Sequence, residues 1–248
     1  MMKLTLAEPK YLKESIAVIS ELVNQAQFKI TKDAVELVAM DPANVAMVVF
    51  KLLSSSFVEY DVSEVTELSI NLDNLKMIMR RITPKDMVTL ELADSKLRVT
   101  LKGDTKRTFD IPILESEDKD QKVPELSFPV SITLPSASIE QAIEDADLVA
   151  ESVLLSADSG NFLISAEGDL SKASIEMKSD GNTKIAIDSK KKVKARYSIE
   201  YLKKIIKGSK ISDTAVLMFN NDYPLKVEYK VVDKMLLAFI LAPRVENE

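Results

Sequence analysis

The sequence predicts an α+β protein made of two similar domains, each with antiparallel strands and two helices. Three observations support this prediction. The 248 residues exceed the usual size of a single hydrophobic core, roughly 100 to 200 residues. Segments with the apolar period of helices alternate with segments that have the period of strands. The order of these segments in the first half of the chain returns in the second half.

The first half is predicted to contain two helices separated by strands. Apolar residues recur at helical spacing between Leu12 and Val23, and Pro9 suits a first helical turn, which predicts a helix over residues 9–24. A second helix has its apolar face within residues 75–82 and ends at Pro84. Short or alternating apolar runs predict strands over residues 28–30, 35–40, 45–53, 68–72, 88–92, 97–101 and 108–114.

The second half repeats this order in nearly constant register. Helices are predicted over residues 136–148 and 199–207, with strands over 153–178 and 192–197 and again after the last helix. Leu75 corresponds to Leu202, 127 positions later, and Asp86 corresponds to Asp213 at the same displacement. Two similar domains that arose by duplication explain this agreement.

A charged segment with two prolines separates the two halves. Residues 115–129 read ESEDKDQKVPELSFP, a composition that suits an extended surface connector. The predicted organisation is therefore a first domain over residues 1–116, a connector over 117–129 and a second domain over 130–248.

The composition excludes several classes of chemistry. The chain has no cysteine, which excludes disulfides and thiolate catalysis, and no histidine, which removes most acid–base and nucleophilic arrangements. A metal-dependent nuclease built from Asp41, Asp158 or Asp169 is a rival hypothesis, but these residues fall mostly at predicted turns. We therefore expect no enzyme, no catalytic residue, no cofactor and no metal. Because no apolar run approaches roughly 20 residues and no signal peptide is evident, a soluble intracellular protein is expected.

The positions of the basic residues matter more than the net charge of -6. Each helical residue advances about 100°, so Lys76 and Arg80 share a face away from the apolar face of their helix. The duplicate helix presents Lys203 and Lys207 in the same way. Exposed lysine is ordinary on a helix, but its repetition at equivalent positions favours contacts with DNA phosphates. The candidate DNA-facing residues are Lys10, Lys13, Lys76, Arg80, Lys203, Lys207 and Lys210.

The third helix departs from this pattern because it is acidic. Glu140, Glu144 and Asp147 stand where the first helix has Lys13, an alanine and a serine, and Asp145 adds another acid. The cluster is consistent with simple solvation, a repulsive patch facing DNA, or one half of a charged seam between subunits. The sequence leaves these three alternatives open.

Several local strings resemble the sliding clamps of the proliferating cell nuclear antigen (PCNA) family, of archaeal type. They are AMDPANV at 39–45, NLDNLKMIMRR from 71, VPELSFP from 123, YPLKVEY from 223 and the terminal LAPRVENE. The resemblance implies a clamp fold in which helices line the channel of a trimeric ring around duplex DNA and sheets form the outside. It also implies a processivity factor that tethers polymerase, flap nuclease and ligase and is loaded by a clamp loader. An archaeal member would be cytoplasmic and nucleoid-associated, and a eukaryotic one nuclear.

The resemblance also assigns candidate protein-binding residues. The groove for short partner motifs, in which a glutamine precedes aliphatic and aromatic anchors, would comprise Met40, Asn44, Val45, Met47, Val123, Phe128, Pro224, Ile240, Leu241, Ala242, Pro243 and Val245. The subunit junction would pair strand 108–114 with strand 173–179 of a neighbour. Its candidate residues are Arg81, Arg107, Ile111, Ile113, Asp145, Ile175 and Met177.

The third helix departs from the family pattern. Gln141 and Glu144 stand where relatives commonly have basic residues on the third helix. A specialised clamp subunit, or a member of a heterotrimer, is therefore the alternative to a homotrimer.

We also expect Arg81 and Arg107 to meet Asp145, together with Glu144, across the junction. Exposed ion pairs contribute only about 0 to 1 kcal/mol each, so such pairs would tune assembly while strand hydrogen bonds dominate.

Overall fold

The computed structural model describes residues 2–115, 121–189 and 191–244 of the chain. Contacts between Cα atoms divide it into two compact units. Unit 1 comprises Met1–Pro42, Val48–Val123 and Val231–Leu237, and unit 2 comprises Ala43–Met47, Pro124–Lys230 and Ala238–Glu248. The predicted domains 1–116 and 130–248 and the connector 117–129 stay predictions, since residues 116–120 lie outside the described part.

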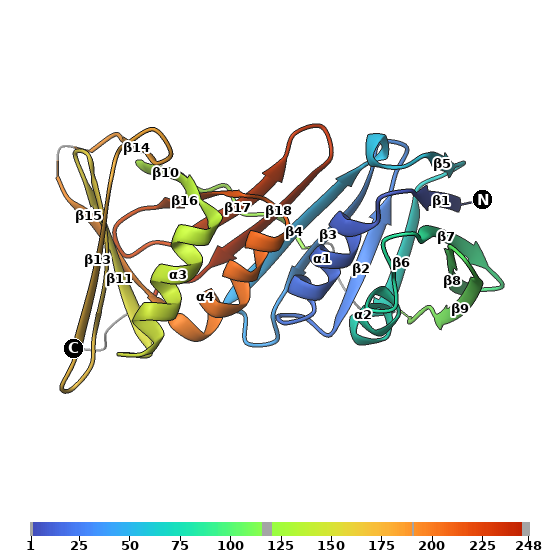
Figure 1. Ribbon diagram of the computed structural model, residues 1–248, viewed down its shortest axis with the longest axis horizontal. Helices are drawn as coiled ribbons and strands as arrows, with labels where there is room; N and C mark the ends of the chain where they lie inside the picture. The colour runs from blue at the N-terminus through green and yellow to red at the C-terminus, as the bar shows by residue number, and fades with distance from the viewer. Residues whose placement is uncertain (1, 116–120, 190, 245–248) are drawn as a thin grey trace. The chain divides into compact units, whose positions relative to one another are not determined.

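Unit 1 contains antiparallel strands and two α-helices. A five-stranded sheet has the order β5-β1-β7-β8-β9, and β4, β3, β2 and β6 are neighbours in that order. Its elements are β1 Met2–Leu6, α1 Lys10–Ile19, β2 Gln25–Ile30, β3 Ala34–Met40, β4 Ala46–Leu53, η1 Ser54–Ser56, β5 Glu59–Val62, β6 Thr66–Asn71, α2 Leu72–Met79, β7 Met87–Ala93, β8 Lys96–Lys102 and β9 Lys106–Pro112. Figure 1 shows α1 and α2 next to each other, and the two helices are in contact.

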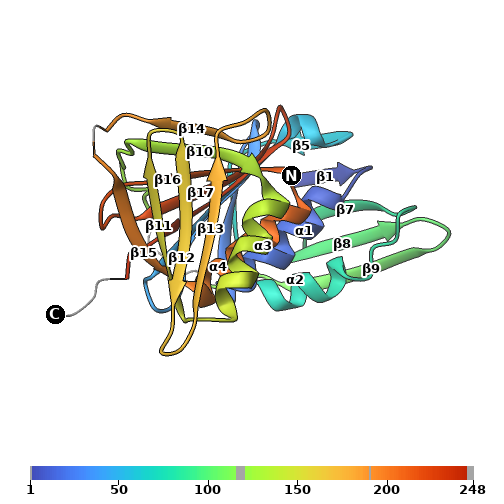
Figure 2. The same ribbon diagram turned by 60° about the vertical axis from the view of Figure 1, so that its left-hand side comes forward.

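Unit 2 has the same plan. The strands β14, β10, β16, β17 and β18 are neighbours in that order, and a four-stranded sheet has the order β13-β12-β11-β15. Its elements are β10 Val130–Pro135, α3 Ser136–Asp147, β11 Ser152–Asp158, β12 Asn161–Glu167, β13 Lys172–Lys178, β14 Lys184–Ile187, β15 Val193–Ser198, α4 Ile199–Ile205, η2 Ile206–Lys210, β16 Thr214–Phe219, β17 Leu225–Val231 and β18 Met235–Leu241. Figure 2 shows β11, β12 and β13 side by side, with α3 packed against their sheet.

The sequence repeat is a repeat of structure. Strand β3 begins at Ala34 and β12 begins at Asn161, 127 positions later, and helices α2 and α4 begin at Leu72 and Ile199 with the same displacement. The order β13-β12-β11-β15 in unit 2 reproduces the order β4-β3-β2-β6 in unit 1. The predicted α+β class, with antiparallel sheets and two α-helices in each half, is confirmed.

Local chemistry explains where α2 begins and which face it buries. The Asn71 side-chain oxygen accepts a hydrogen bond of 3.0 Å from the Asn74 backbone N–H and so caps the helix. Leu72, Leu75 and Met79 are buried. Since these residues recur at three- and four-residue spacing, one face of α2 packs inward and the other faces solvent.

The structure corrects several predicted boundaries. Helix α1 ends at Ile19, not at residue 24, because the Ser20 hydroxyl donates to the Ala17 carbonyl at 3.0 Å and the Glu21 N–H bonds three residues back, to Val18. Residue 72 begins α2 and does not end a strand. Strands β1, β5, β10 and β14 were not predicted. Two of them, β5 and β14, are short and largely exposed, so their apolar pattern is weak.

Candidate nucleic-acid interface and protein-binding surfaces

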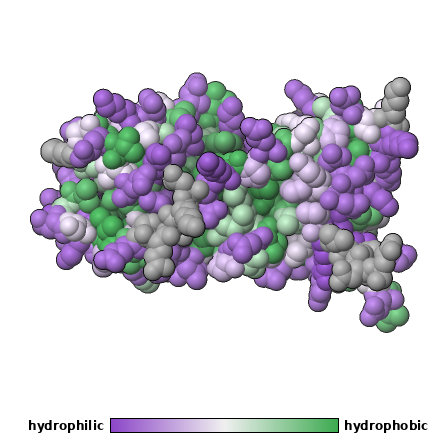
Figure 3. Space-filling model, turned by 180° about the vertical axis from the view of Figure 1, so that it is seen from behind, coloured by the Kyte–Doolittle hydropathy of each residue, from purple (hydrophilic) through white to green (hydrophobic). Residues whose placement is uncertain are grey.

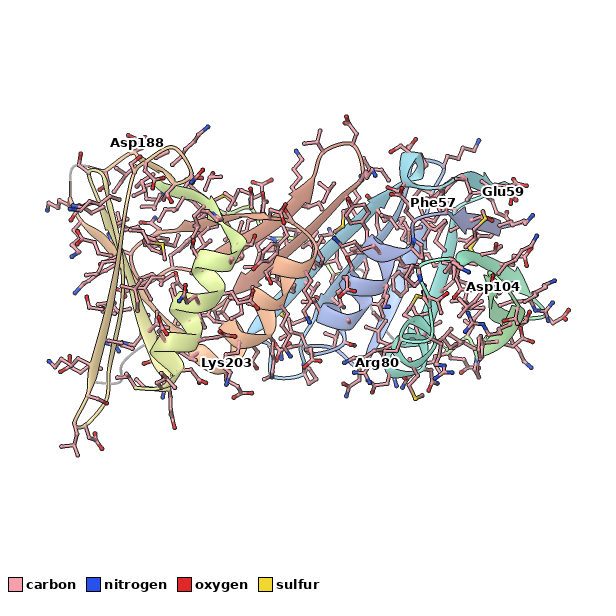
Figure 4. All side chains as sticks on the ribbon, in the orientation of Figure 1. Phe57, Glu59, Arg80, Asp104, Asp188 and Lys203 are labelled. Atoms are coloured by element: carbon pink, nitrogen blue, oxygen red, sulfur yellow. The ribbon has the colours of Figure 1, made fainter. Side chains whose placement is uncertain are left out.

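The candidate DNA-facing basic residues of unit 1 differ in exposure and in the partners of their charged groups. The Lys76 ammonium lies 2.9 Å from a carboxylate oxygen of Glu21, and only 14% of the Lys76 side chain is exposed. The Lys13 ammonium donates to the Ile82 carbonyl at 3.3 Å. Lys10 and Arg80 are exposed, and Figure 4 labels Arg80 at the C-terminal end of α2. A phosphate would therefore find Lys10 and Arg80 more available than Lys76.

The candidate DNA-facing lysines of unit 2 also differ in their pairing and exposure. The Lys203 ammonium, on α4, lies 2.6 Å from a carboxylate oxygen of Asp147, the last residue of α3 (Lys203 is labelled in Figure 4). Lys210 is exposed and Lys207 is half-buried. The sequence predicted that these side chains face solvent, but it gave no sign that Glu21 or Asp147 would pair with the lysines.

The structure separates the roles of the acids on α3. Asp147 pairs with Lys203, whereas Glu144 and Asp145 are exposed. Glu140 is half-buried and lies near the buried Tyr229, where burial first and the Glu140 charge second raise the pKa of the Tyr229 hydroxyl. The sequence offered three alternatives for this cluster, and the pairing of Asp147 with a lysine on the adjacent helix is not one of them. For Glu144 and Asp145 the three alternatives stay predictions.

Two of the candidate groove residues in unit 1 line one cavity. Met40, on β3, and Val123 both border a cavity of about 520 Å³, together with the charged side chains of Glu36 and Lys51. Val123 is 43% exposed. This cavity combines apolar side chains with charged ones, as binding pockets generally do.

Several candidate groove residues of unit 2 are exposed or half-buried. Asn44 is exposed and has a φ of 57°, a left-handed conformation that asparagine tolerates. The Val45 carbonyl accepts the Ala242 N–H at 2.9 Å. The rings of Phe128 and Tyr223 pack edge to face at 5.9 Å. The half-buried residues are Val45, Phe128, Pro224, Ala242 and Pro243.

Three further groove candidates lie inside unit 2. Met47, Ile240 and Leu241 are 5%, 7% and 0% exposed. They support neighbouring residues from within and do not present side chains to solvent. Val245 lies outside the described residues.

Seen from behind, hydrophobic patches interrupt a mainly hydrophilic surface (Figure 3).

Two candidate junction strands are the ends of their sheets. Strand β9 ends the order β5-β1-β7-β8-β9, and β13 ends the order β13-β12-β11-β15. Among the described residues, each of these two strands thus has one edge without a neighbouring strand, and an open strand edge is a template for pairing with another chain.

Side chains on both strands suit such pairing. Arg81, Arg107 and Ile111 line one groove of about 640 Å³ beside α2, and the apolar Met77 in that groove is 58% exposed. On β13, Ile175 and Met177 are half-buried and alternate with exposed residues. Ile113 is half-buried and follows the end of β9.

A buried carboxylate holds Arg107 inside unit 1. Asp86 is 2% exposed and accepts hydrogen bonds from Arg107 Nη2, from the Thr83 N–H at 2.7 Å and from the Thr83 hydroxyl at 2.9 Å. A second nitrogen of Arg107 donates to the Arg81 carbonyl at 3.1 Å. The expected contact of Arg107 with Asp145 of a neighbour stays a prediction, and Arg107 has a partner within its own unit. In the sequence, Asp86 stood out only as a marker of the repeat.

These contacts lower the pKa of Asp86 from its ordinary value of 3.8 to about 2, with the Arg107 hydrogen bond as the largest cause. A carboxyl group whose pKa is lower in the folded than in the unfolded state stabilises the fold at pH values above its unfolded-state pKa. This contribution is lost as the pH falls from about 4 through about 2. Asp86→Asn is therefore expected to lower the melting temperature at pH 7, and the difference from the parent protein is expected to shrink between pH 4 and 2.

Thermal unfolding monitored by circular dichroism across this pH range measures the effect. Asp104→Asn is the matched control, because Asp104 pairs with Lys85 at 3.2 Å with both side chains more than 70% exposed. Figure 4 labels Asp104. Equal melting temperatures for the two variants at pH 7 would contradict a stabilising role for Asp86.

Two properties of the described residues bear on other functions. Among the described residues, no group of three or more acidic side chains is placed to hold a metal ion. Within the same part of the chain, no helix is long and apolar enough to cross a membrane.

Comparison with known proteins identifies the family. The family models for the N-terminal and C-terminal domains of proliferating cell nuclear antigen match residues 1–120 and 122–244. The DNA polymerase sliding clamp of Nanoarchaeum equitans (strain Kin4-M) is 35% identical over 247 residues, which cover 98% of this chain and 99% of that one. The DNA polymerase sliding clamp of Thermococcus onnurineus (strain NA1) is 34% identical over 239 residues, 96% of each chain.

A solved structure has the same fold. The crystal structure of PCNA from Thermococcus kodakaraensis superposes with a TM-score of 0.92 at 22% sequence identity, and the match covers 98% of this chain and 100% of that one. The family models and the full-length relatives extend the likeness from fold to sequence. The chain belongs to the proliferating cell nuclear antigen family.

Proposed function

We propose that this chain is a DNA polymerase sliding clamp, which encircles duplex DNA as a trimeric ring and tethers replication and repair proteins to it. The observation that carries the proposal is the match over nearly the whole chain to relatives named DNA polymerase sliding clamp. The duplicated plan, with two α-helices in each half and cations on three of the four, supports it. The chemistry belongs to the tethered enzymes.

Ring closure would come from the open edges of β9 and β13. The two edges differ, so pairing β9 of one chain with β13 of the next is a head-to-tail contact, which generates a ring when the rotation closes. Three copies of this chain make the proposed homotrimer. A heterotrimer with related subunits is the alternative, and a mass measurement of the purified protein alone distinguishes the two.

Contact with DNA would be weak and independent of sequence. Exposed cations such as Lys10, Arg80 and Lys210 suit phosphate contacts, which position a protein on a duplex but read no bases. The acidic residues Glu144 and Asp145 are exposed on α3 and add no attraction. Closure of the ring would therefore retain DNA more than charge would, as sliding requires.

Partner proteins would bind by short motifs with apolar anchors. Met40 and Val123 offer one apolar wall, and Val45, Phe128 and Pro243 offer half-buried apolar surface in unit 2. Polymerase, flap nuclease, ligase and clamp loader are the partners expected. Tethering raises the effective concentration of such a partner at the DNA, which explains a gain in processivity. An archaeal clamp of this kind would act at the nucleoid.

Primer extension on circular primed DNA tests the proposal. With an archaeal polymerase and clamp loader, the protein is expected to lengthen the products, and no lengthening at any concentration would refute a sliding clamp. Replacement of Lys76, Arg80, Lys203 and Lys207 by alanine is expected to impair loading. It should also make the salt dependence of duplex binding shallower by about 0.9 logarithmic units for each phosphate that the variant no longer neutralises.

The matched control removes the same charge elsewhere. Alanine at Lys32, Lys85, Lys184 and Lys230, all exposed, is expected to leave loading unchanged. Binding of a partner-motif peptide, measured by calorimetry, is expected to survive in both variants. Loss of peptide binding with normal loading would overturn the assignment of the basic residues.

A further inference from the structure

Two lysines at corresponding positions of the repeat are each bound by a carboxylate of the same unit. Lys76 on α2 and Lys203 on α4 are 127 positions apart. The Lys76 ammonium lies 2.9 Å from Glu21, in the turn that follows α1, and the Lys203 ammonium lies 2.6 Å from Asp147, at the end of α3. In each unit the pair therefore lies where the C-terminal end of one helix, or the turn that follows it, meets the helix packed beside it.

The acids themselves do not correspond in the repeat. The position 127 after Glu21 is Leu148, and the position 127 before Asp147 is Ser20. The two halves thus reach the same ion pair from positions one residue apart in register. An arrangement that is reproduced in space, although its acid has moved along the chain, indicates that the pairing itself has a use.

A carboxylate in this position competes with a phosphate. Both groups offer anionic oxygens that accept charge-assisted hydrogen bonds from an ammonium. Lys76 is 14% and Glu21 31% exposed, and Lys203 is 49% and Asp147 38% exposed, so both pairs can be reached from solvent. A DNA phosphate that binds either lysine must first displace a carboxylate and then lie beside it. Such a contact adds less to DNA affinity than one made by the exposed Arg80.

We propose that Glu21 and Asp147 compete with DNA phosphates for Lys76 and Lys203. This competition would weaken the salt-dependent binding of the ring to DNA and speed its sliding. This inference rests on the proposed function. It makes the two acids regulators of a nonspecific contact. The exposed Arg80, four positions after Lys76, would carry more of that contact than Lys76 and Lys203 do.

The test uses the full chain with Glu21→Gln and Asp147→Asn together. Binding of a short DNA duplex is measured by fluorescence anisotropy at several salt concentrations. The variant is expected to bind several-fold more tightly at low salt. Its log–log salt dependence should steepen by up to about 1.8, which is about 0.9 for each of two lysines released to phosphates. Loaded on long DNA, it should diffuse more slowly in single-molecule tracking.

The matched control is Glu59→Gln with Glu200→Gln, which changes the net charge equally. It breaks the Glu59–Lys3 pair of 2.9 Å and the Glu200–Lys204 pair of 3.1 Å (Figure 4 labels Glu59). The pairs of Lys76 and Lys203 stay intact. The control is expected to keep the parent salt dependence. Equal steepening in both double variants would overturn the proposal, because net charge alone would then explain the gain.

A second variant separates the lysines from general effects. Lys76→Ala and Lys203→Ala, added to the Glu21→Gln and Asp147→Asn variant, are expected to abolish the gain in affinity, and a gain that persists would refute the proposal. Circular dichroism confirms that each variant is folded. Primer extension by the parent protein judges the sliding-clamp function separately, so a failure there is distinguishable from a failure of the acid–lysine pairs.

Discussion

Glu176→Pro is expected to shift the proposed ring toward single chains. On β13 the ladder bonds fall on alternate residues, since the Gly168 N–H donates to the Ser171 carbonyl and the Ser179 N–H donates to the Gly160 carbonyl. In an antiparallel ladder this places the N–H of Glu176, between them, on the open edge of the sheet. Proline removes that donor and puts ring carbons where a neighbouring strand would approach.

The expected effect on assembly is large because the loss falls on the strand that would join two subunits. A backbone hydrogen bond contributes about 0.5 to 1.5 kcal/mol net, and steric exclusion of the neighbouring strand adds to this loss. Since about 1.4 kcal/mol is tenfold in a dissociation constant, the constant is expected to rise tenfold or more. Analytical ultracentrifugation over a concentration series measures it.

Glu176→Ala is the matched control for assembly. It removes the same exposed side chain but keeps the N–H, so it should assemble like the parent protein. Glu176→Pro should remain folded, because an edge strand tolerates proline where the N–H faces outward. If Glu176→Pro had the same mass as the parent protein at every concentration, β13 would not be a junction strand.

Gly208→Ala is expected to destabilise unit 2. A Cβ atom at Gly208, in η2, would lie 2.3 Å from the ring of Tyr229, and the Tyr229 side chain is fully buried. Close-packed surroundings leave the ring nowhere to move, and overpacking of this kind costs about 1 to 3 kcal/mol. For a chain of this size the melting temperature is expected to fall by about 2 to 12 °C.

Gly181→Ala is the control for this substitution. A Cβ atom there meets nothing within 4 Å, so the melting temperature should stay close to that of the parent protein. Differential scanning calorimetry compares the two variants. A Gly208→Ala protein as stable as Gly181→Ala would show that Tyr229 can shift and that the packing at η2 is loose.

The class of the fold and its duplication could be predicted from the sequence alone. Periodic apolar residues are a local signal, so the buried faces of α2 and α4 and the 127-residue register could be read without coordinates. Strands β5 and β14 were missed because exposed edge strands carry little apolar periodicity. Family membership also followed from sequence, through the strings at 39–45 and at the C-terminus.

The pairing of charges in the candidate site depends on the tertiary structure and could not be predicted from the sequence. The sequence placed Lys76, Lys203 and Arg107 near the predicted surfaces. Their partners Glu21, Asp147 and Asp86 are 55, 56 and 21 positions away along the chain. Charge partners on different elements leave no periodic trace in sequence, because their meeting depends on how helices and strands pack. For the same reason, which lysines remain free for DNA could be settled only by folding the chain.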